Sequence, residues 1–377
     1  MVKNSNCFFL QASISLILLL SCFSYAQDRY GAYGLFPQGS HRVMAMGGAY
    51  AALSDDATGV TYNPAGLAFQ PYWGDLGGNV NTVYNREVDL DGDGQKDGIP
   101  YTYHYYAATF RAGDFGFGVG SNSPYNLNIS FNSDLGGFTE TRTLQLTVET
   151  FNLPVAYRIS KQWSFGVNLQ GHTVTERYRF VSTNPSTSEV DVATKATAAT
   201  IVSGIMFRPD ETWSFGLFYS PRAEFNDINS ELNNQTGGVN WFRNVVIPSK
   251  TTLGGAYRLD RWVFTLDLDH FEGLSNVQYV GSQLIPEFRR VEFDGKEKWV
   301  LHGGVEWNPV STNMWDWYLR AGSYNEPPRA LGVGSRQHTT FGTELRYWVL
   351  SLSAAVDGAE NFANFAVGLG VSLKPYL

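Results

Sequence analysis

The stretch WSFGVNL (163–169) decides the fold, because large apolar residues alternate in it with small or polar ones. Successive side chains of a β-strand point to opposite faces, so a period of two predicts a strand with one apolar and one polar face. The pattern recurs along the chain in WSFGLFY (213–219), WVFTLDLD (262–269), WVLHGGVEW (299–307) and the final run at 365–374. The chain is therefore predicted to be all-β.

The number and length of these runs favour a transmembrane antiparallel β-barrel over a soluble sandwich. Aromatic residues recur at the ends of runs, and the runs approach the roughly 9–11 residues that a tilted strand needs to cross a bilayer. Short and long connections alternate, as in barrels with short periplasmic turns and long external loops. We expect the barrel to occupy residues 76–377. About fourteen strands are predicted, near 76–86, 101–112, 115–122, 143–158, 163–181, 192–208, 212–224, 246–258, 261–271, 297–307, 315–324, 338–346, 349–356 and 364–374. By parity, several charged residues of these runs face the lumen, namely Asp267, Asp269, Glu306, Glu344 and Arg346.

Composition excludes several classes of function. The 377-residue chain has 15% aromatic residues and only 16% charged residues, whereas soluble domains carry about 25% charged residues. A net charge of −8 argues against a nucleic-acid partner. Six histidines are scattered without metal-site spacing, and the chain has no nucleophile elbow, phosphate-binding loop or dinucleotide fingerprint. We expect a protein that is not an enzyme and requires no cofactor.

The N-terminus has the features of a signal peptide, residues 1–26. An apolar run at 14–20 precedes Ser-Tyr-Ala, which ends at Ala26 and offers the small residues that signal peptidase reads. The alternative is a lipoprotein signal with Cys22 lipidated. Both cysteines, Cys7 and Cys22, lie in this leader, so we expect a mature chain without a disulfide or a thiolate metal site.

The stretch SDDATGVTYNPAGLAF (54–69) is neither a clean strand nor a long helix. Its small residues would let the backbone pack inside a narrow lumen, and Pro64 fixes a turn. Asp55 and Asp56 are expected to cap a short helix or to pair with cations of the lumen. We predict that residues 27–75 form a hatch that plugs the barrel; the alternative is a periplasmic linker.

Four segments resemble the FadL/TodX family of outer-membrane transporters for long-chain fatty acids and other hydrophobic molecules. The segments are RVMAMGGAYAALSDDATGVTYNPAGLA (42–68), FNLPVAYRIS (151–160), IPSKTTLGGAYRL (247–259) and YLRAGSYNEPP (318–328). Related barrels share the first segment, including those that resemble the PorV component of type IX secretion. The resemblance implies a fourteen-stranded barrel with an N-terminal hatch inside it.

The resemblance also implies where the ligand moves. The Asn-Pro-Ala part of the hatch would lie beside the substrate path, which points to Asn63, Pro64, Ala65, Gly66, Asp55 and Asp56. The ligand would leave sideways through the wall at an early kinked strand. Gly116, Gly118 and Gly120 make the third strand deformable; alternatively, these glycines only make room for the hatch. The external segments depart from the family, because 122–141 and 226–240 are mostly polar where apolar loops are common.

The strand at 143–158 changes the face of its apolar residues. Leu146 and Val148 share one parity, whereas Phe151 and Leu153 have the other. A β-bulge near Thr150 would explain the shift. Its effect is either a structural bend or a wall defect near the substrate path.

The loop DLDGDGQKDG (89–98) is a candidate calcium site. Asp89, Asp91, Asp93 and Asp97 occupy the spacing of a calcium loop, and a glycine follows at the position of its sharp turn. Proline stands where the bidentate glutamate is usual, so the alternative is a solvated acidic turn.

The sequence therefore predicts a bacterial outer-membrane barrel that carries hydrophobic small molecules, such as long-chain fatty acids, by passive diffusion with hatch movement and lateral release. The alternative is a scaffold or PorV-like secretion partner; a general porin conflicts with a plugged lumen. Expected partners are the hydrophobic ligand, outer-membrane lipids and the barrel-assembly machinery. The last strand, GLGVSL (368–373), resembles the signal that this machinery reads.

Overall fold

The structure is a computed structural model. It describes residues 29–31, 39–87, 89, 94–98, 101–135, 137–185, 189–226, 244–280 and 291–373. The expected signal peptide, with its alternative lipidation site, lies outside the described residues, as do Asp91 and Asp93 of the candidate calcium loop.

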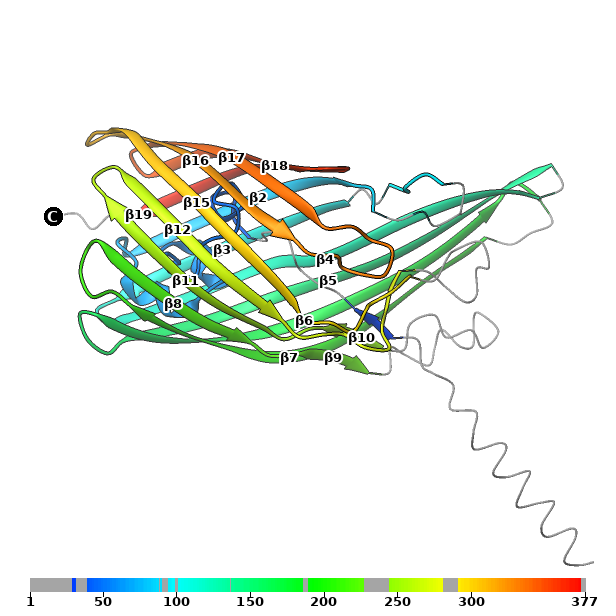
Figure 1. The fold of residues 1–377 in the computed structure, drawn as a ribbon, viewed down its shortest axis with the longest axis horizontal. Coiled ribbons are helices and arrows are strands. Elements are labelled where there is room, and N and C mark those ends of the chain that lie inside the picture. The colour runs from blue at the N-terminus through cyan, green and yellow to red at the C-terminus, as the bar shows by residue number, and fades with distance from the viewer. Residues whose placement is uncertain are drawn as a thin grey trace, which may run out of the picture.

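Fourteen antiparallel strands close into one barrel, as predicted (Figure 1). Its strands are β2 (Gly74–Asn85), β3 (Tyr101–Ala112), β4 (Phe115–Leu135), β5 (Phe138–Arg158), β6 (Trp163–Ser182), β7 (Val190–Phe207), β8 (Trp213–Ser220), β11 (Lys250–Leu259), β12 (Trp262–Phe271), β15 (Lys298–Ser311), β16 (Trp315–Glu326), β17 (Arg336–Tyr347), β18 (Leu350–Ala359) and β19 (Phe362–Leu373). The first and last barrel strands, β2 and β19, pair from Asn85 and Phe362 to Gly74 and Leu373. Closure leaves no unpaired edge for the lipid to meet.

A second, five-stranded sheet has the order β14-β13-β1-β10-β9. Its strands are β1 (Arg29–Gly31), β9 (Ala223–Asn226), β10 (Asn244–Ile247), β13 (Gln278–Val280) and β14 (Val291–Glu292). Figure 1 places β9 and β10 at the end of the barrel opposite the C-terminus. We call this end the mouth. The sheet joins the N-terminal strand to segments from the long loops.

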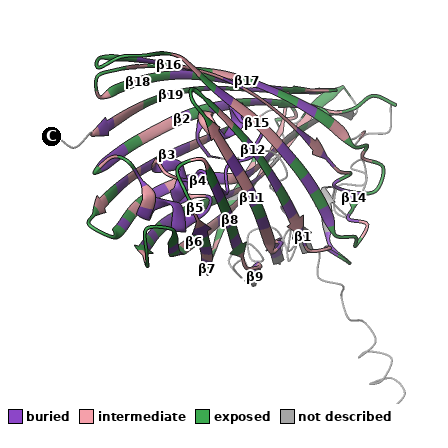
Figure 2. Cartoon of the chain, turned by 60° about the vertical axis from the view of Figure 1, so that its left-hand side comes forward, coloured by how far each residue is buried: buried purple, intermediate pink, exposed green. Residues whose placement is uncertain are grey.

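The polarity of the two faces of wall strand β5 reverses along its length. Side chains of even number are buried from Leu146 to Ala156, and its register with β6 is unbroken from Glu140 opposite Ser182 to Arg158 opposite Ser164. From 151 to 157 the outward, odd-numbered residues are apolar, whereas from 145 to 149 they are polar and the buried Leu146 and Val148 are apolar. We call the part of the wall at the level of residues 151–158 the turn half, and the part at the level of residues 138–150 the mouth half. Figure 2 shows the buried and exposed residues alternating along the strands.

The β-bulge that was predicted near Thr150 of β5 lies in the neighbouring strand β4. The register of β4 and β5 shifts between Asn122 and Tyr125, opposite Thr150 and Val148. The extra residue therefore belongs to β4 and not to β5. In β5 the apolar residues change face without a change of phase, because the environment outside the wall changes from lipid to water.

The prediction of a loop at 123–142, between the expected strands 115–122 and 143–158, is wrong. It is strand for most of its length, because β4 continues to Leu135 and β5 begins at Phe138. Tyr125 and Leu127 pair with Val148 and Leu146, and all four side chains are buried. The polar residues between them lie on the outer face of a wall that extends beyond the lipid.

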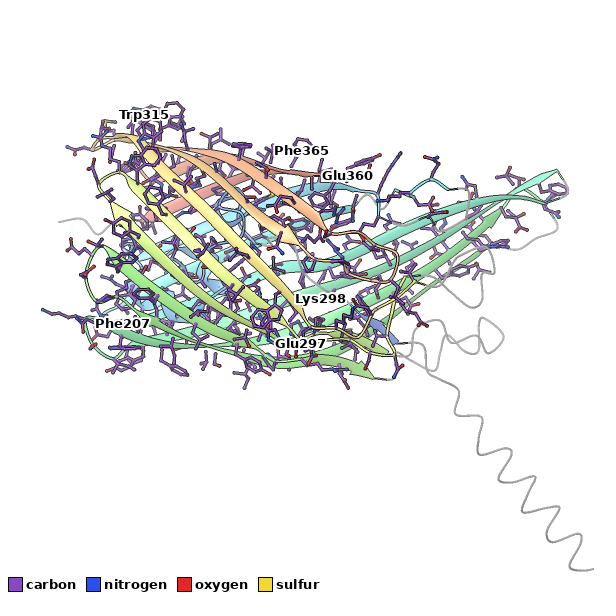
Figure 3. The ribbon with its side chains drawn as sticks, viewed as in Figure 1. Phe207, Glu297, Lys298, Trp315, Glu360 and Phe365 are labelled. Carbon is purple, nitrogen blue, oxygen red and sulfur yellow. The ribbon has the colours of Figure 1, made fainter. Side chains whose placement is uncertain are left out.

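Aromatic pairs form a belt at the turn end of the wall. Outward-facing rings of neighbouring strands meet in Trp163–Phe207 at 4.3 Å, Trp213–Tyr257 at 4.6 Å, Trp262–Trp307 at 5.2 Å and Trp315–Tyr347 at 4.5 Å between centroids. In Figure 3 the labelled Trp315 and Phe207 both lie at the end of the barrel where the C-terminus emerges. Such a belt marks a membrane–water interface. Within the described part of the chain, no helix is long and apolar enough to cross a membrane.

Candidate functional site

The segment 39–73 occupies the turn half of the lumen, and we call it the plug. It contains the helix α2 (His41–Ala45) and the 3₁₀ helices η1 (Ala57–Val60) and η2 (Pro64–Phe69). Each helix begins with a side-chain cap, since Ser40, Asp56 and Asn63 accept hydrogen bonds from the first turns of α2, η1 and η2. Pro64 starts η2, where its missing N–H costs nothing.

Inward-facing glycines of the wall make room for the plug. A Cβ on Gly216 would lie 2.1 Å from the carbonyl oxygen of Ala51, and a Cβ on Gly166 would lie 2.5 Å from the nitrogen of Ala65. A Cβ on Gly322 would lie 2.3 Å from the nitrogen of Gly47. These glycines are on three different strands, so the backbone of the plug contacts the wall on several sides.

The repeated WSFG sequence explains two of these contacts. In both copies the tryptophan and phenylalanine face outward, while the serine and glycine face the plug. Ser164 Oγ donates to the carbonyl of Ala65 at 2.8 Å, and Ser214 Oγ donates to the carbonyl of Ala52 at 2.8 Å. The motif therefore encodes a belt residue outside and a plug contact inside.

Buried charges join the plug to the wall strands β15, β16 and β17. Arg42 of α2 donates to Glu306 from Nε at 2.9 Å and from Nη2 at 3.1 Å, and it also pairs with Asp56 at 2.9 Å. Arg320 continues the network, since it lies 2.7 Å from Glu306 and 2.8 Å from Glu344. Charges of opposite sign alternate, so no carboxylate of this network is left without a cation.

Asp55 is held by a second set of arginines. Its carboxylate lies 3.0 Å from Arg208 and 3.4 Å from Arg258. Burial raises the pKa of Asp55, but the attraction of Arg208, Arg258 and Arg42 is larger, and the net pKa lies below its ordinary value of 3.8. The carboxylate is therefore charged at neutral pH and ties the plug to β11 and to the turn that follows β7.

Two wall carboxylates bind backbone N–H groups of the plug. Asp267 Oδ2 accepts from Tyr50 at 2.6 Å and from Ala51 at 2.7 Å. Asp75 Oδ2 accepts from Ala57 at 2.7 Å. A cavity of about 40 Å³ remains between the plug and β2/β19; a water molecule takes about 30 Å³ in the liquid. This contact region has no space for a hydrophobic ligand.

The structure brings the six hatch residues of the sequence prediction together in the plug. Asn63 is fully buried, and its Nδ2 donates to the carbonyls of Ala51 at 3.1 Å and Ile205 at 3.0 Å. Asp56 both caps a helix and pairs with a lumen cation, and Asp55 pairs with cations only. Their place beside a substrate path stays a prediction.

The sequence placed Glu306, Glu344 and Arg346 in the lumen by parity, and Arg346 pairs with Glu344 at 2.8 Å. Arg258 and Arg320 were missed, although both occupy inward positions of strands, as was Arg208, which directly follows β7. An arginine on the polar face of a membrane strand is normally paired. This rule could have predicted that such arginines bind carboxylates in the lumen.

Gly116, Gly118 and Gly120 face the plug. A Cβ on Gly116 would lie 2.5 Å from the backbone of Leu67. The pairing of β3 with β4 continues across all three glycines and runs as far as Tyr105 opposite Asn122. The contacts favour glycines that make room for the plug; a wall opening at them stays a prediction.

The candidate calcium loop is described in part. Asp89 Oδ2 accepts a hydrogen bond from the backbone of Gly94 at 3.2 Å. No group of three metal-ligating side chains occurs among the residues that the structure describes. With Asp91 and Asp93 outside them, calcium binding stays a prediction.

The mouth half of the lumen has an apolar side and a charged side. Its cluster of buried side chains combines wall residues such as Leu146, Val148 and Val174 with Phe225 of β9 and Val245 of β10. On the side of β2, β16 and β17, buried charges pair, since Arg336 lies 2.7 Å from Glu326 and 2.8 Å from Glu87. The β4–β6 side of the lumen therefore changes from polar around the plug to apolar near the mouth.

The chain matches the family model described as "Outer membrane protein transport protein (OMPP1/FadL/TodX)" over residues 38–230, just over half its length. No curated protein matches the chain. Among solved structures, a Pseudomonas aeruginosa FadL homologue is similar, with a TM-score of 0.63, 13% identity and coverage of 90% of this chain and 99% of that one. The Pseudomonas putida toluene transporter TodX gives a TM-score of 0.60 at 15% identity, with coverage of 93% and 99%. The Ralstonia pickettii toluene transporter TbuX gives 0.59 at 13%, with coverage of 90% and 99%.

Proposed function

The chain belongs to the OMPP1/FadL/TodX family of outer-membrane transport proteins, and from this premise we propose that it admits hydrophobic small molecules, long-chain fatty acids among them, by movement of the plug. Members of this family lie in the bacterial outer membrane and are transporters of hydrophobic compounds, not enzymes. The substrate and the steps of passage are our proposal.

The observation that carries the proposal is an apolar cluster at the mouth on the β4–β6 side of the lumen, followed by the tightly bound plug. A hydrophobic molecule that enters at the mouth meets the cluster around Val148 and Phe225, where its apolar surface leaves water. It then meets the plug, where Arg42 and Asp55 are bound to the wall and a cavity beside β2 and β19 measures only about 40 Å³. Passage therefore requires the plug to shift.

We further propose that the ligand leaves sideways at β4, on the lipid side of its register shift. The extra residue between Asn122 and Tyr125 interrupts the ladder with β5 at the edge of the turn half, and Pro154, inside that half, lacks the N–H for a ladder bond. An apolar groove of about 1270 Å³ lies on the lipid-facing side of this wall, and Val119 and Phe151 line it. The groove supports lateral release because a molecule leaving there would stay out of water.

A disulfide between the plug and β2 tests plug movement. A Cβ built on Gly77 lies 3.8 Å from the Cβ of Ala57, and disulfides have Cβ atoms about 3.8 Å apart. The variant Ala57→Cys/Gly77→Cys should close this bridge when oxidised. We expect oxidised cells to take up labelled oleate and toluene at about one tenth of the reduced rate or less, since the plug cannot leave the wall.

Each single variant, Ala57→Cys and Gly77→Cys, serves as the control and should be insensitive to reductant. Oxidised double-variant cells that transport as fast as reduced ones would show that the plug need not move. Cells that lack the protein and still take up both probes normally would overturn the transport proposal and favour a scaffold.

A further inference from the structure

We propose that Glu176 and Tyr125 bind the polar end of the ligand in the mouth half, so that this chain prefers hydrophobic molecules whose polar group donates a hydrogen bond, such as amines and alcohols. The inference rests on the proposed transport function and narrows it to a ligand class. Fatty acids remain among the molecules that the protein admits, but this site binds them less tightly than amines.

Glu176 is a buried carboxyl without a partner. It lies on the inner face of β6 and is 3% exposed, and neither of its carboxylate oxygens has a hydrogen-bond partner in the described part of the chain. Its neighbour across the ladder with β5 is the buried Leu146, and Val174 precedes it on the same face. A carboxyl in such surroundings destabilises the protein unless something donates to it.

Tyr125 carries a second unpaired polar group. Its ring belongs to the same apolar cluster, yet its hydroxyl is buried without a hydrogen-bond partner among the described residues. Buried tyrosine hydroxyls usually find a partner. Two orphan polar groups in one apolar cluster point to a missing ligand more strongly than either would alone.

The two groups lie on adjacent rows of the same wall. Tyr125 is opposite Val148, which is opposite Val174, so these three residues form one row across β4, β5 and β6. Glu176 lies one strand repeat further toward the mouth. Strand spacing and rise place its Cα about 10 Å across and about 7 Å along the wall from that of Tyr125.

Loop-borne segments cover this part of the wall. Phe225 of β9 meets the ring of His172 at 6.3 Å between centroids, four residues before Glu176 on the same face of β6. Val245 and Val246 of β10 complete the cluster. A ligand that enters between these segments and the wall would replace their apolar contacts with its own. Its polar end could then form hydrogen bonds with the two unpartnered groups.

The chemistry of the two groups selects the ligand. Without a partner, burial raises the pKa of Glu176 well above its ordinary value and favours the neutral carboxyl. Its carbonyl oxygen and the tyrosine hydroxyl can accept a hydrogen bond from a ligand hydroxyl. An ammonium group would displace the proton of Glu176 to solvent and form the stronger, charge-assisted pair with the carboxylate. A ligand carboxylate would bury its negative charge beside a group that supplies no cation to pair with it.

Binding of three probes with the same chain tests the inference. Dodecylamine, 1-dodecanol and sodium dodecanoate are titrated into the full-length protein in nanodiscs, with empty nanodiscs as the blank. We expect the wild type to bind dodecylamine at least about tenfold more tightly than dodecanoate, the factor expected for one charge-assisted hydrogen bond. Glu176→Gln should bring the two within about twofold, and Tyr125→Phe should weaken dodecanol binding by about fivefold.

Glu149→Gln is the matched control, because it removes a carboxyl from the outward, exposed side of the neighbouring strand β5. It should bind all three probes like the wild type. Heat-modifiable migration in gels confirms that each variant still forms a barrel. Equal affinity for all probes in the wild type, or an amine preference that survives Glu176→Gln, would overturn the inference and leave transport of hydrophobic molecules standing. If none of the probes binds, both proposals fail.

Discussion

The turn half and the mouth half of the wall share one alternation of side chains but have opposite polarity. On β6, Phe165 and Leu169 face outward and are 42% and 50% exposed, while Asn168 is buried inside. Nearer the mouth, Arg177 faces outward and Val174 is buried inside. The phase of the strand is continuous between the two halves.

The difference shows what fixes the polarity of a barrel wall. Lipid surrounds the turn half, so its outer face is apolar and its lumen holds the polar groups that grip the plug. Water surrounds the mouth half, so its outer face is polar and its lumen holds an apolar cluster, with the buried ion pairs of Arg336 confined to the side of β2, β16 and β17. Each half has its own main stabilising interaction, and substitutions that act on one half should not act on the other.

The largest effect is expected from the charge network of the turn half. Arg320→Ala leaves Glu306 and Glu344 buried with fewer cations, although Arg42 and Arg346 still pair with them. We expect the free energy of unfolding to fall by about 3 kcal/mol, the lower end for breaking a buried pair. Urea unfolding followed by tryptophan fluorescence measures this.

The matching variant in the mouth half is Arg177→Ala, which removes an exposed pair with Asp191. Exposed pairs contribute little, so no measurable change is expected. An equal loss in both variants would mean that the two halves do not differ in how they use charge.

The next effect concerns the outer face. Leu169→Arg places a charge toward the lipid and should cost about 2 kcal/mol, since the penalty is about 2–4 kcal/mol at the bilayer midplane and falls toward its edges. Thr175→Arg, six residues further along the outer face of β6, should cost less than about 0.5 kcal/mol, as an ordinary surface change does. Reversible folding into lipid vesicles gives both values, and similar costs would place the lipid boundary elsewhere.

A smaller effect is expected where the wall meets the plug. Gly216→Ala adds a Cβ that would lie 2.1 Å from the carbonyl oxygen of Ala51. Overpacking of this kind costs about 1–3 kcal/mol, and we expect it to loosen the plug, which single-channel conductance would detect as more frequent openings. Gly171→Ala on the outer face of β6 is the control, because a Cβ there meets nothing within 4 Å.

The smallest effect is a pH dependence carried by Asp55. Its folded pKa lies below the ordinary 3.8 because the arginines around it outweigh its burial. The charged form therefore stabilises the folded state above about pH 4, and this contribution is lost as the pH falls below that value. Thermal unfolding between pH 2 and pH 7 should show a weaker acid dependence in Asp55→Asn than in the wild type; parallel curves would exclude this role.

The sequence alone determined the architecture, because the signal is repeated in every strand. Each run such as 163–169 carries the period of two, and the alternation of short and long connections then predicts fourteen strands and their order. The predicted boundaries failed at 123–142, where the polar outer face of a strand beyond the lipid has the composition of a loop.

The sequence also determined that residues 54–69 are small and turn-forming, which is what a plug needs. Only the tertiary structure decided what holds the plug, since Arg42 and Glu306 are 264 positions apart and no local pattern joins them. It also decided which face of each half is the core. A strand fixes the alternation of its side chains, but whether lipid, water or a plug lies on each side depends on the closed barrel.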